Sequence, residues 1–289
     1  MPKWNPINIC SYHLQEAGAT PEQELSFALA TAIGVLEYLQ KSEIISKQLF
    51  EKIVGRISFF VNSGMRFVTE TAKMASFTEL WEEICRKRFK ISDPKYRRFR
   101  YGMQVNSLGL TELQPENNVY RILIQMLPVV IAKNSRARAV QLPAWNEALG
   151  LPRPWDQQWS LRLQQIMAYE TDLLEFSDIF KGSEVLKEKI KSLKLSANNE
   201  LKKIDELGGL VPAIENGYLK SQLVQSQTNR QKNIEKGEQK VVGVNCFADG
   251  EQSPLINEKD GGFMKVDDKA EKLQIKNVEE WKSKRNNKK

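Results

Sequence analysis

The feature that most restricts the fold of this chain is a fourfold alternation of short apolar segments with long amphipathic ones. The strand-like segments end near residues 13, 60, 104 and 142, and a helix-like segment follows each of them. Strands that alternate with helices pair in parallel, because each helix carries the chain back to the same end of the sheet. The pattern fits an open doubly wound sheet or part of a (β/α)8 barrel. In both folds, ligands bind at the carboxyl ends of the strands.

Local signals place these elements more closely. We expect strands at Ile7–Tyr12, Ile57–Val61, Phe99–Val105 and Ala137–Leu142. We expect one helix to start at Pro21 and three more to cover residues 64–85, 115–133 and 155–176. Thr20 and Gln23 match a capping box at the start of the first helix, and Pro21 suits its first turn.

The pattern changes after Gly182. We expect a Lys/Glu-rich amphipathic helix over 183–207, a helical turn over 211–214, a helix over 218–235 and a strand at Val241–Val244. From about Asp249 the composition is typical of a linker or flexible tail, with a short helix around Trp281 as an option.

Composition excludes several classes of protein. No apolar run approaches the ~20 residues that a membrane span needs, and the first ten residues do not resemble a signal peptide. The three distant cysteines (Cys10, Cys85 and Cys246) indicate reduced thiols in a cytoplasmic protein. His13 is the only histidine, so we expect no His-rich metal site.

The net charge of +7 is concentrated in residues 86–100, where eight cations face the single acid Asp93. This segment is either a solvated helix end or a phosphate-binding patch, since Arg and Lys supply charge-assisted donors. The phosphates could belong to a nucleic acid, a phosphorylated cofactor or an acyl-CoA. A second basic cluster, residues 282–289, is expected to be a disordered tail.

Polar residues gather where the expected strands end. They lie in the segments 11–16, 56–60, 100–104 and 141–147. In a barrel all four segments point into one mouth. A single histidine is more often structural than catalytic, but the polar neighbours of His13 favour a role in a site.

Four motifs resemble one known family in the order in which that family has them. They are SYHLQEAGAT at 11–20, RxSFF with GMxFxxExAKM at 56–74, YGMQVNSLGLTE at 101–112 and QLPAWNEALGLPRPWDQQWSLR at 141–162. The family is that of the adenosylcobalamin-dependent acyl-CoA mutases, the methylmalonyl-CoA mutase family, and the last motif resembles its ethylmalonyl-CoA mutase branch. The resemblance covers roughly residues 4 to 285.

The resemblance implies an α/β fold that is the second half of a (β/α)8 TIM-type barrel, with about four βα units. Residues 1–181 would form the half-barrel, 182–248 a helical extension and 249–289 a linker or tail. Family members thread acyl-CoA along the barrel axis beneath a separate cobalamin domain. Homolysis of the cobalt–carbon bond gives a radical that starts the carbon-skeleton rearrangement, so the implied class is isomerase.

The resemblance also assigns roles to single residues. His13 matches the histidine that hydrogen-bonds the thioester carbonyl, and Tyr12 matches its neighbour near the reactive groups. Arg56 and Ser58 match residues that contact the CoA chain. Gln104 matches a glutamine of the acyl pocket, and Glu147 matches a glutamate near the adenosyl ribose.

Two departures from the methylmalonyl pattern bear on the substrate. Gly102 stands where methylmalonyl-CoA mutases usually have histidine, and Pro143 stands where they usually have asparagine. The smaller residue would leave room for a bulkier acyl branch. We therefore expect conversion of ethylmalonyl-CoA to methylsuccinyl-CoA, with a methylmalonyl-CoA mutase subunit as the alternative.

The expected partners follow from what the motifs do not cover. The family's first half-barrel has no counterpart here, and its D-x-H-x-x-G cobalt-ligand motif is absent, since Ser11 stands two residues before His13. We expect a complementary half-barrel chain and a cobalamin-binding domain or subunit, and no turnover by the chain alone. A non-catalytic remnant or structural partner chain is the rival hypothesis. Nucleic-acid binding is a distant third because no recognition motif supports it.

Overall fold

Four parallel strands form one sheet in the order β1-β2-β3-β4. The computed structural model describes residues 5, 7–256, 262–265 and 267–286. The strands are β1 (Asn8–Cys10), β2 (Ser58–Ser63), β3 (Tyr101–Val105) and β4 (Ala139–Gln141). Each strand pairs with the next one along the chain, which is the strand order of a barrel wall. The predicted βα alternation is confirmed; β1, β3 and β4 are shorter than expected, and β2 is one residue longer.

Helices follow each strand. They are α1 (Tyr12–Glu16), α2 (Pro21–Gln40), α3 (Lys47–Val54), α4 (Phe67–Lys87), α5 (Asn118–Ile131) and α6 (Pro154–Tyr169). The capping box of α2 is present as predicted: the Gln23 amide N–H donates to the Thr20 hydroxyl and the Thr20 N–H donates to the Gln23 side chain. Pro128 lies inside α5.

The helices cover only one face of the sheet. On that face Ile9, Phe59, Val61 and Met103 are almost fully buried in a core that they share with α2 and α4. On the other face Asn8, Cys10, Ala139 and Gln141 are exposed, and Ser58, Phe60 and Gly102 are half-buried. A doubly wound sheet has helices on both faces, so this one-sided sheet is instead a segment of barrel wall with its inner face open.

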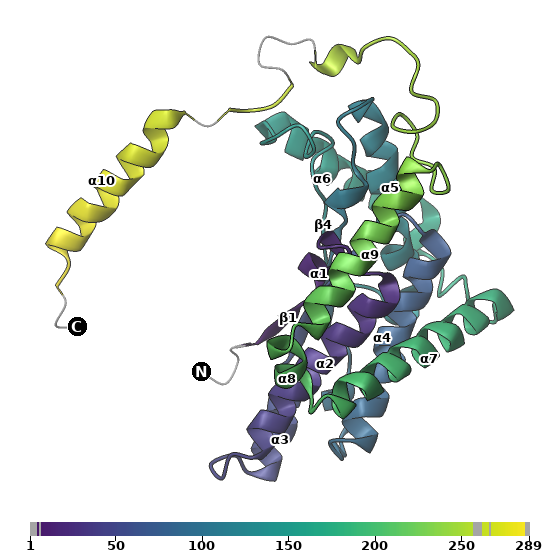
Figure 1. Ribbon diagram of the computed structural model, residues 1–289, viewed down its shortest axis with the longest axis vertical. Coiled ribbons are helices and arrows are strands. Elements are labelled where there is room, and N and C mark those ends of the chain that lie inside the picture. The colour runs from purple at the N-terminus through teal and green to yellow at the C-terminus, as the bar shows by residue number, and fades with distance from the viewer. Residues whose placement is uncertain (1–4, 6, 257–261, 266, 287–289) are drawn as a thin grey trace.

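A further helical layer lies outside α2 and α4 (Figure 1). It consists of α7 (Glu184–Glu206), α8 (Leu210–Glu215) and α9 (Tyr218–Glu235), all close to their expected bounds. α7 buries Leu193, Ala197 and Ile204, and its Lys194 pairs with two glutamates of α4. The side chain of Ser226 on α9 donates to the carbonyl of Gly18, which ties α9 to the loop before α2.

Three sequence expectations need correction. α3 was not anticipated, although Ser46 caps it by accepting from the Leu49 N–H. The strand at Val241–Val244 is wrong: this segment is a turn with one isolated bridge from Val242 to Cys246. The segment around Trp281 belongs to a 17-residue helix, α10 (Asp268–Lys284), which Figure 1 shows apart from the main body. The expectation of a disordered basic tail from residue 282 is wrong at its start, because Lys282 and Lys284 form the last turn of α10. Lys288 and Lys289 lie outside the described residues.

Among the helices that the structure describes, none is both long and apolar enough to cross a membrane.

Candidate active site on the inner face of the sheet

Tyr12, His13 and Gln104 come together at the carboxyl ends of β1 and β3. Tyr12 and His13 open α1 directly after β1, and their ring centroids are 4.2 Å apart. Glu16 and Gln104 lie close enough to the Tyr12 hydroxyl to influence its pKa. Burial, followed by the Glu16 carboxylate, raises the pKa of Tyr12. His13 itself is exposed, so its imidazole faces the open side of the sheet.

Two carboxylates lie at the same rim. Glu147 follows β4, and desolvation of its carboxyl group raises its pKa although the residue as a whole is exposed. The Glu16 carboxylate adds a smaller contribution in the same direction. Glu16 belongs to the polar segment 11–16 expected at the rim, but the motifs assign it no role; its carboxylate raises the pKa of both Tyr12 and Glu147.

Gly102 and Phe60 face each other on the inner side of the sheet. They are register partners on β3 and β2, and a Cβ atom added at Gly102 would lie 3.0 Å from Cδ2 of Phe60. The ring of Phe60 also packs edge-on against Tyr12, with centroids 6.0 Å apart. The space beside Gly102 therefore contains the Phe60 ring, and Phe60 links Gly102 to the residues at the rim.

The prediction that all four polar segments point into one mouth is wrong for Arg56 and Arg100, because these residues precede β2 and β3 and lie at the opposite ends of the strands. Arg56, Arg100 and Arg138 line a cavity of about 310 Å³ together with Ser58 and Gly102. Burial, followed by the neighbouring Arg138, Arg56 and Arg98, lowers the pKa of Arg100. In the described part of the chain, Arg100 and Arg138 form no ion pair. The cavity gathers three guanidinium groups, and no Asp or Glu is among its described lining residues, which favours a ligand with phosphate groups.

The structure divides the basic segment 86–100 between two roles. Most of its cations pair with carboxylates on the helical side: Arg86 and Arg97 with Glu82, Lys87 with Glu83, Lys95 with Asp93, and Arg88 with Glu37 and Asp205. Among these pairs, those of Arg88 connect α4 with α2 and α7. Arg100 is the residue of this segment that faces the arginine cavity.

A buried ionic network supports the rim from the helical side. Lys73 of α4 lies 2.5 Å from a Glu24 oxygen and 2.6 Å from a Glu70 oxygen, and all three side chains are buried. The Ser11 hydroxyl, just before Tyr12, donates to Glu24, and so does the N–H of Asn62 on β2. The network therefore fixes the ends of β1 and β2 relative to α2 and α4.

The residues present fit one side of a bound adenosylcobalamin. Glu147 and Tyr12 place polar groups at the open rim, where an adenosyl group could contact them. The chain offers no histidine ligand for the cobalt, because its only histidine, His13, stands two residues after Ser11 and no Asp-x-His motif is present. Within the described residues, no group of three or more His, Cys, Asp or Glu side chains could hold a metal ion.

Fold and geometry together define one part of a barrel, with a polar rim at the carboxyl ends of its strands and an arginine-lined cavity at the other ends. The family model described as methylmalonyl-CoA mutase matches residues 1–289. The chain belongs to the methylmalonyl-CoA mutase family.

Individual relatives agree with this assignment. The chain is 60% identical over 283 residues to the ethylmalonyl-CoA mutase of Cereibacter sphaeroides, covering 98% of this chain and 43% of the relative. It is 59% identical over 285 residues to the ethylmalonyl-CoA mutase of Methylorubrum extorquens, covering 99% of this chain and 41% of the relative. It is 30% identical over 291 residues to the methylmalonyl-CoA mutase of Rhizobium meliloti, covering 100% and 39%. The chain thus spans about two fifths of the length of these relatives.

Proposed function

We propose that this chain supplies one half of the substrate barrel of an adenosylcobalamin-dependent acyl-CoA mutase. The proposed reaction is the isomerisation of ethylmalonyl-CoA to methylsuccinyl-CoA. The proposed division of the chain is a half-barrel over 1–181, a helical extension over 182–248 and a linker or tail over 249–289. The identity of about 60% to two ethylmalonyl-CoA mutases favours this substrate over methylmalonyl-CoA.

The observation that carries the proposal is the open inner face of the sheet. It runs from the arginine cavity at the start of β2 to the polar rim beyond β3. Five residues of strand span about 16 Å at a rise of about 3.3 Å per residue. We place the phosphates of CoA at the arginines and the acyl group at Tyr12 and His13. Gly102 and Phe60 line the arginine cavity, and the Phe60 ring packs against Tyr12, so these two residues lie between the two ends.

Each site residue then has a proposed role. Arg56 and Ser58 hold the CoA chain, and Gln104 lines the acyl pocket beside Gly102. His13 donates a hydrogen bond to the thioester carbonyl oxygen, which stabilises negative charge that develops there. Tyr12 packs against the reacting acyl group, and Glu147 contacts the adenosyl ribose. Adenosylcobalamin, when bound, would supply the radical chemistry.

The open sheet also indicates what must complete the site. β1 and β4 are its two edge strands, and unpaired strand edges and an uncovered inner face are unfavourable in water. We propose that four further strands and a cobalamin-binding domain, from the same or another polypeptide, close the barrel. The rival hypothesis, a structural partner without turnover, predicts closure of the barrel without mutase activity.

The phosphate end of the proposed site can be tested with Arg138→Gln in the assembled enzyme. We expect this change to weaken CoA binding about tenfold, because it removes one charge-assisted contact to a phosphate. Isothermal titration with CoA measures the effect. Arg136→Gln is the matched control, since Arg136 is exposed and lies outside the cavity.

A second ligand makes the Arg138 test specific. Pantetheine lacks the nucleotide phosphates and should bind more weakly than CoA. Its dissociation constant should be the same for the parent protein and for Arg138→Gln. If Arg138→Gln and Arg136→Gln weaken CoA binding equally, or if pantetheine binding falls as much as CoA binding, the arginine cavity does not hold the phosphates.

The acyl end can be tested with Gly102→Ala in the assembled mutase. The added Cβ would push the Phe60 ring toward the acyl group, so the bulkier ethyl branch should suffer more than the methyl branch. We expect the ratio of kcat/KM for ethylmalonyl-CoA over methylmalonyl-CoA to fall about tenfold or more, as expected for one methylene in a tight pocket. Gly102→Ala combined with Phe60→Leu should recover most of the ratio. An equal loss with both substrates would contradict this role for Gly102.

A further inference from the structure

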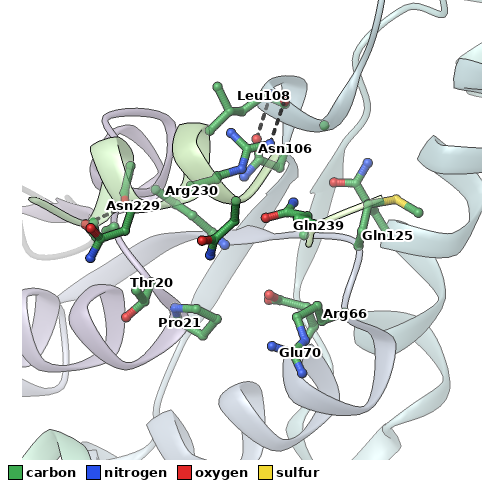
Figure 2. Close-up of a pocket in the computed structure, with 18 residues that line it drawn as sticks. Thr20, Pro21, Arg66, Glu70, Asn106, Leu108, Gln125, Asn229, Arg230 and Gln239 are labelled. Carbon is green, nitrogen blue, oxygen red and sulfur yellow. Dashed lines mark hydrogen bonds between the residues drawn. The ribbon is translucent and has the colours of Figure 1, made fainter. Parts of the chain in front are cut away.

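A second cavity lies among the helices at the carboxyl ends of β1, β2 and β3, outside the barrel wall. Its volume is about 430 Å³, and the loops after these strands and α9 enclose it. None of the residues that we place on the inner face lines this cavity in the described part of the chain. Figure 2 shows Gln125, Gln239 and Arg66 on one side of it and Thr20, Pro21 and Asn229 on the other.

Two buried amide side chains in the wall of this cavity lack hydrogen-bond partners. Gln125 of α5 is fully buried, and neither its Nε2 nor its Oε1 has a partner. Gln15 is 9% exposed, and its Oε1 also has none. A buried polar atom without a partner costs about 1–3 kcal/mol, so a cavity that contains three such atoms is suited to a polar occupant.

The charges around the cavity favour an anion. The charged side chains that line it are Arg66, Arg230 and Glu70. Glu70 is already paired with Lys73, which shares its charge with Glu24 as well. Among the described residues, the Arg230 guanidinium donates only to the carbonyl of Leu108, and burial lowers its pKa. Two cations therefore line the cavity against one carboxylate, and that carboxylate already shares Lys73 with Glu24.

The start of α4 adds positive potential. α4 has 21 residues and no side-chain cap, and its N-cap residue Arg66 lines the cavity together with Gly64 and Met65. Uncapped N–H groups and the helix dipole attract anions at such an end. The N-terminus of α2 also borders the cavity, but its capping box of Thr20 and Gln23 already satisfies N–H groups at this end.

We propose that this cavity binds a small oxyanion, a phosphate or a carboxylate, between Arg230, Arg66 and the Nε2 donor of Gln125. The Oε1 atoms of Gln125 and Gln15 only accept hydrogen bonds, so water molecules beside the anion would donate to them. Space for it exists because Gly109 has no side chain beside Gln125: a Cβ there would lie 3.7 Å from Nε2 of Gln125. The cavity is larger than a phosphate ion, so water molecules would fill the remainder. Bound there, the anion would connect α9 to α4 and α5 behind the active-site rim.

The test is a titration of the full chain with inorganic phosphate and, separately, with succinate at constant ionic strength. All proteins carry Arg138→Gln, which weakens binding in the arginine cavity of the inner face and keeps its remaining contribution the same in every variant. Thermal unfolding gives the dissociation constant, because a ligand of the folded state raises Tm as its concentration rises. Stabilisation by phosphate alone identifies an inorganic ion, and stabilisation by succinate alone identifies an organic acid.

Two variants of the wall and one control decide the location. Arg230→Gln should weaken binding about tenfold, because it removes a charge-assisted contact. Gln125→Leu should leave the ligand-free Tm equal or higher, since it removes two unpartnered atoms, and should weaken binding about tenfold as well. Lys232→Gln, an exposed position of α9 outside the cavity, should bind like the parent.

The pattern of binding across the variants either supports or overturns the proposed site. Loss of binding in Arg230→Gln and Gln125→Leu with retention in Lys232→Gln supports the site. No stabilisation of the parent by either anion, or equal binding by all variants, overturns it.

Discussion

Replacing Lys73 with methionine should lower the free energy of unfolding by about 3–5 kcal/mol, the usual effect of removing one partner from a buried ion pair. Lys73 is fully buried between Glu24 and Glu70 and also donates to the carbonyl of Asn62 at 2.8 Å. Without it, two carboxylates would remain buried with no cation. Urea unfolding at pH 7.5 measures the loss.

The pH dependence of the Lys73→Met variant has a definite sign. Burial raises the pKa of Glu24 even in the parent, where Lys73 opposes the shift. Burial alone would lower the pKa of Lys73, but Glu24 and Glu70 outweigh it and raise that pKa. In Lys73→Met the folded state should bind more protons than the unfolded state at mildly acidic pH. Its stability should therefore rise as the pH falls toward about 5, and the difference from the parent should shrink.

Lys87→Met is the matched control for Lys73→Met. Lys87 also pairs with a glutamate of α4, but its side chain is 63% exposed. An exposed pair contributes about 0–1 kcal/mol, so this variant should unfold almost like the parent. Equal stability losses in the two variants would show that the buried network does not support the fold as we describe.

Replacing His13 with alanine should lower kcat of the assembled mutase by about 100- to 1000-fold, the usual effect of removing one donor to a developing oxyanion. His13 is exposed, and its ring packs against Tyr12 with centroids 4.2 Å apart, so the variant removes little buried contact and should fold normally. Circular dichroism tests the folding, and turnover of ethylmalonyl-CoA tests the activity.

His13→Gln and Tyr169→Phe serve as controls for His13→Ala. His13→Gln keeps a hydrogen-bond donor and should lose less activity than His13→Ala. Tyr169, an exposed residue at the end of α6, should tolerate the loss of its hydroxyl. A decrease in kcat of less than tenfold in His13→Ala would remove His13 from the proposed chemistry.

Features that depend on neighbouring residues could be predicted from the sequence. The capping box of Thr20 and Gln23 needs only three residues of separation, and the helices over 184–206 and 218–235 follow from local periodicity and flanking glycines. The four βα units were also predictable, because strand and helix have different apolar periods. The motifs identified the family and placed Tyr12, His13 and Gln104 near one rim, where they lie.

Local signals failed where a tertiary partner decides the structure. Val241–Val244 has the composition of a strand, but no strand of the sheet lies beside it, so it forms a turn. The segment 47–54 carries only a short amphipathic pattern, which is too weak to predict a helix by itself. Its Phe50 and Val54 pack on the core, and this packing stabilises it as α3.

The sequence by itself determined the order of elements, the family and the residues of the rim, because these depend on local pattern and contiguous motifs. Only the tertiary structure decided which charged side chains pair with each other and which of them line a cavity. It pairs Lys73 with Glu24 across 49 positions, gathers Arg56, Arg100 and Arg138 at three strand starts, and buries Gln125 beside an open cavity. Charge and burial act through distance in space, which a linear pattern does not contain.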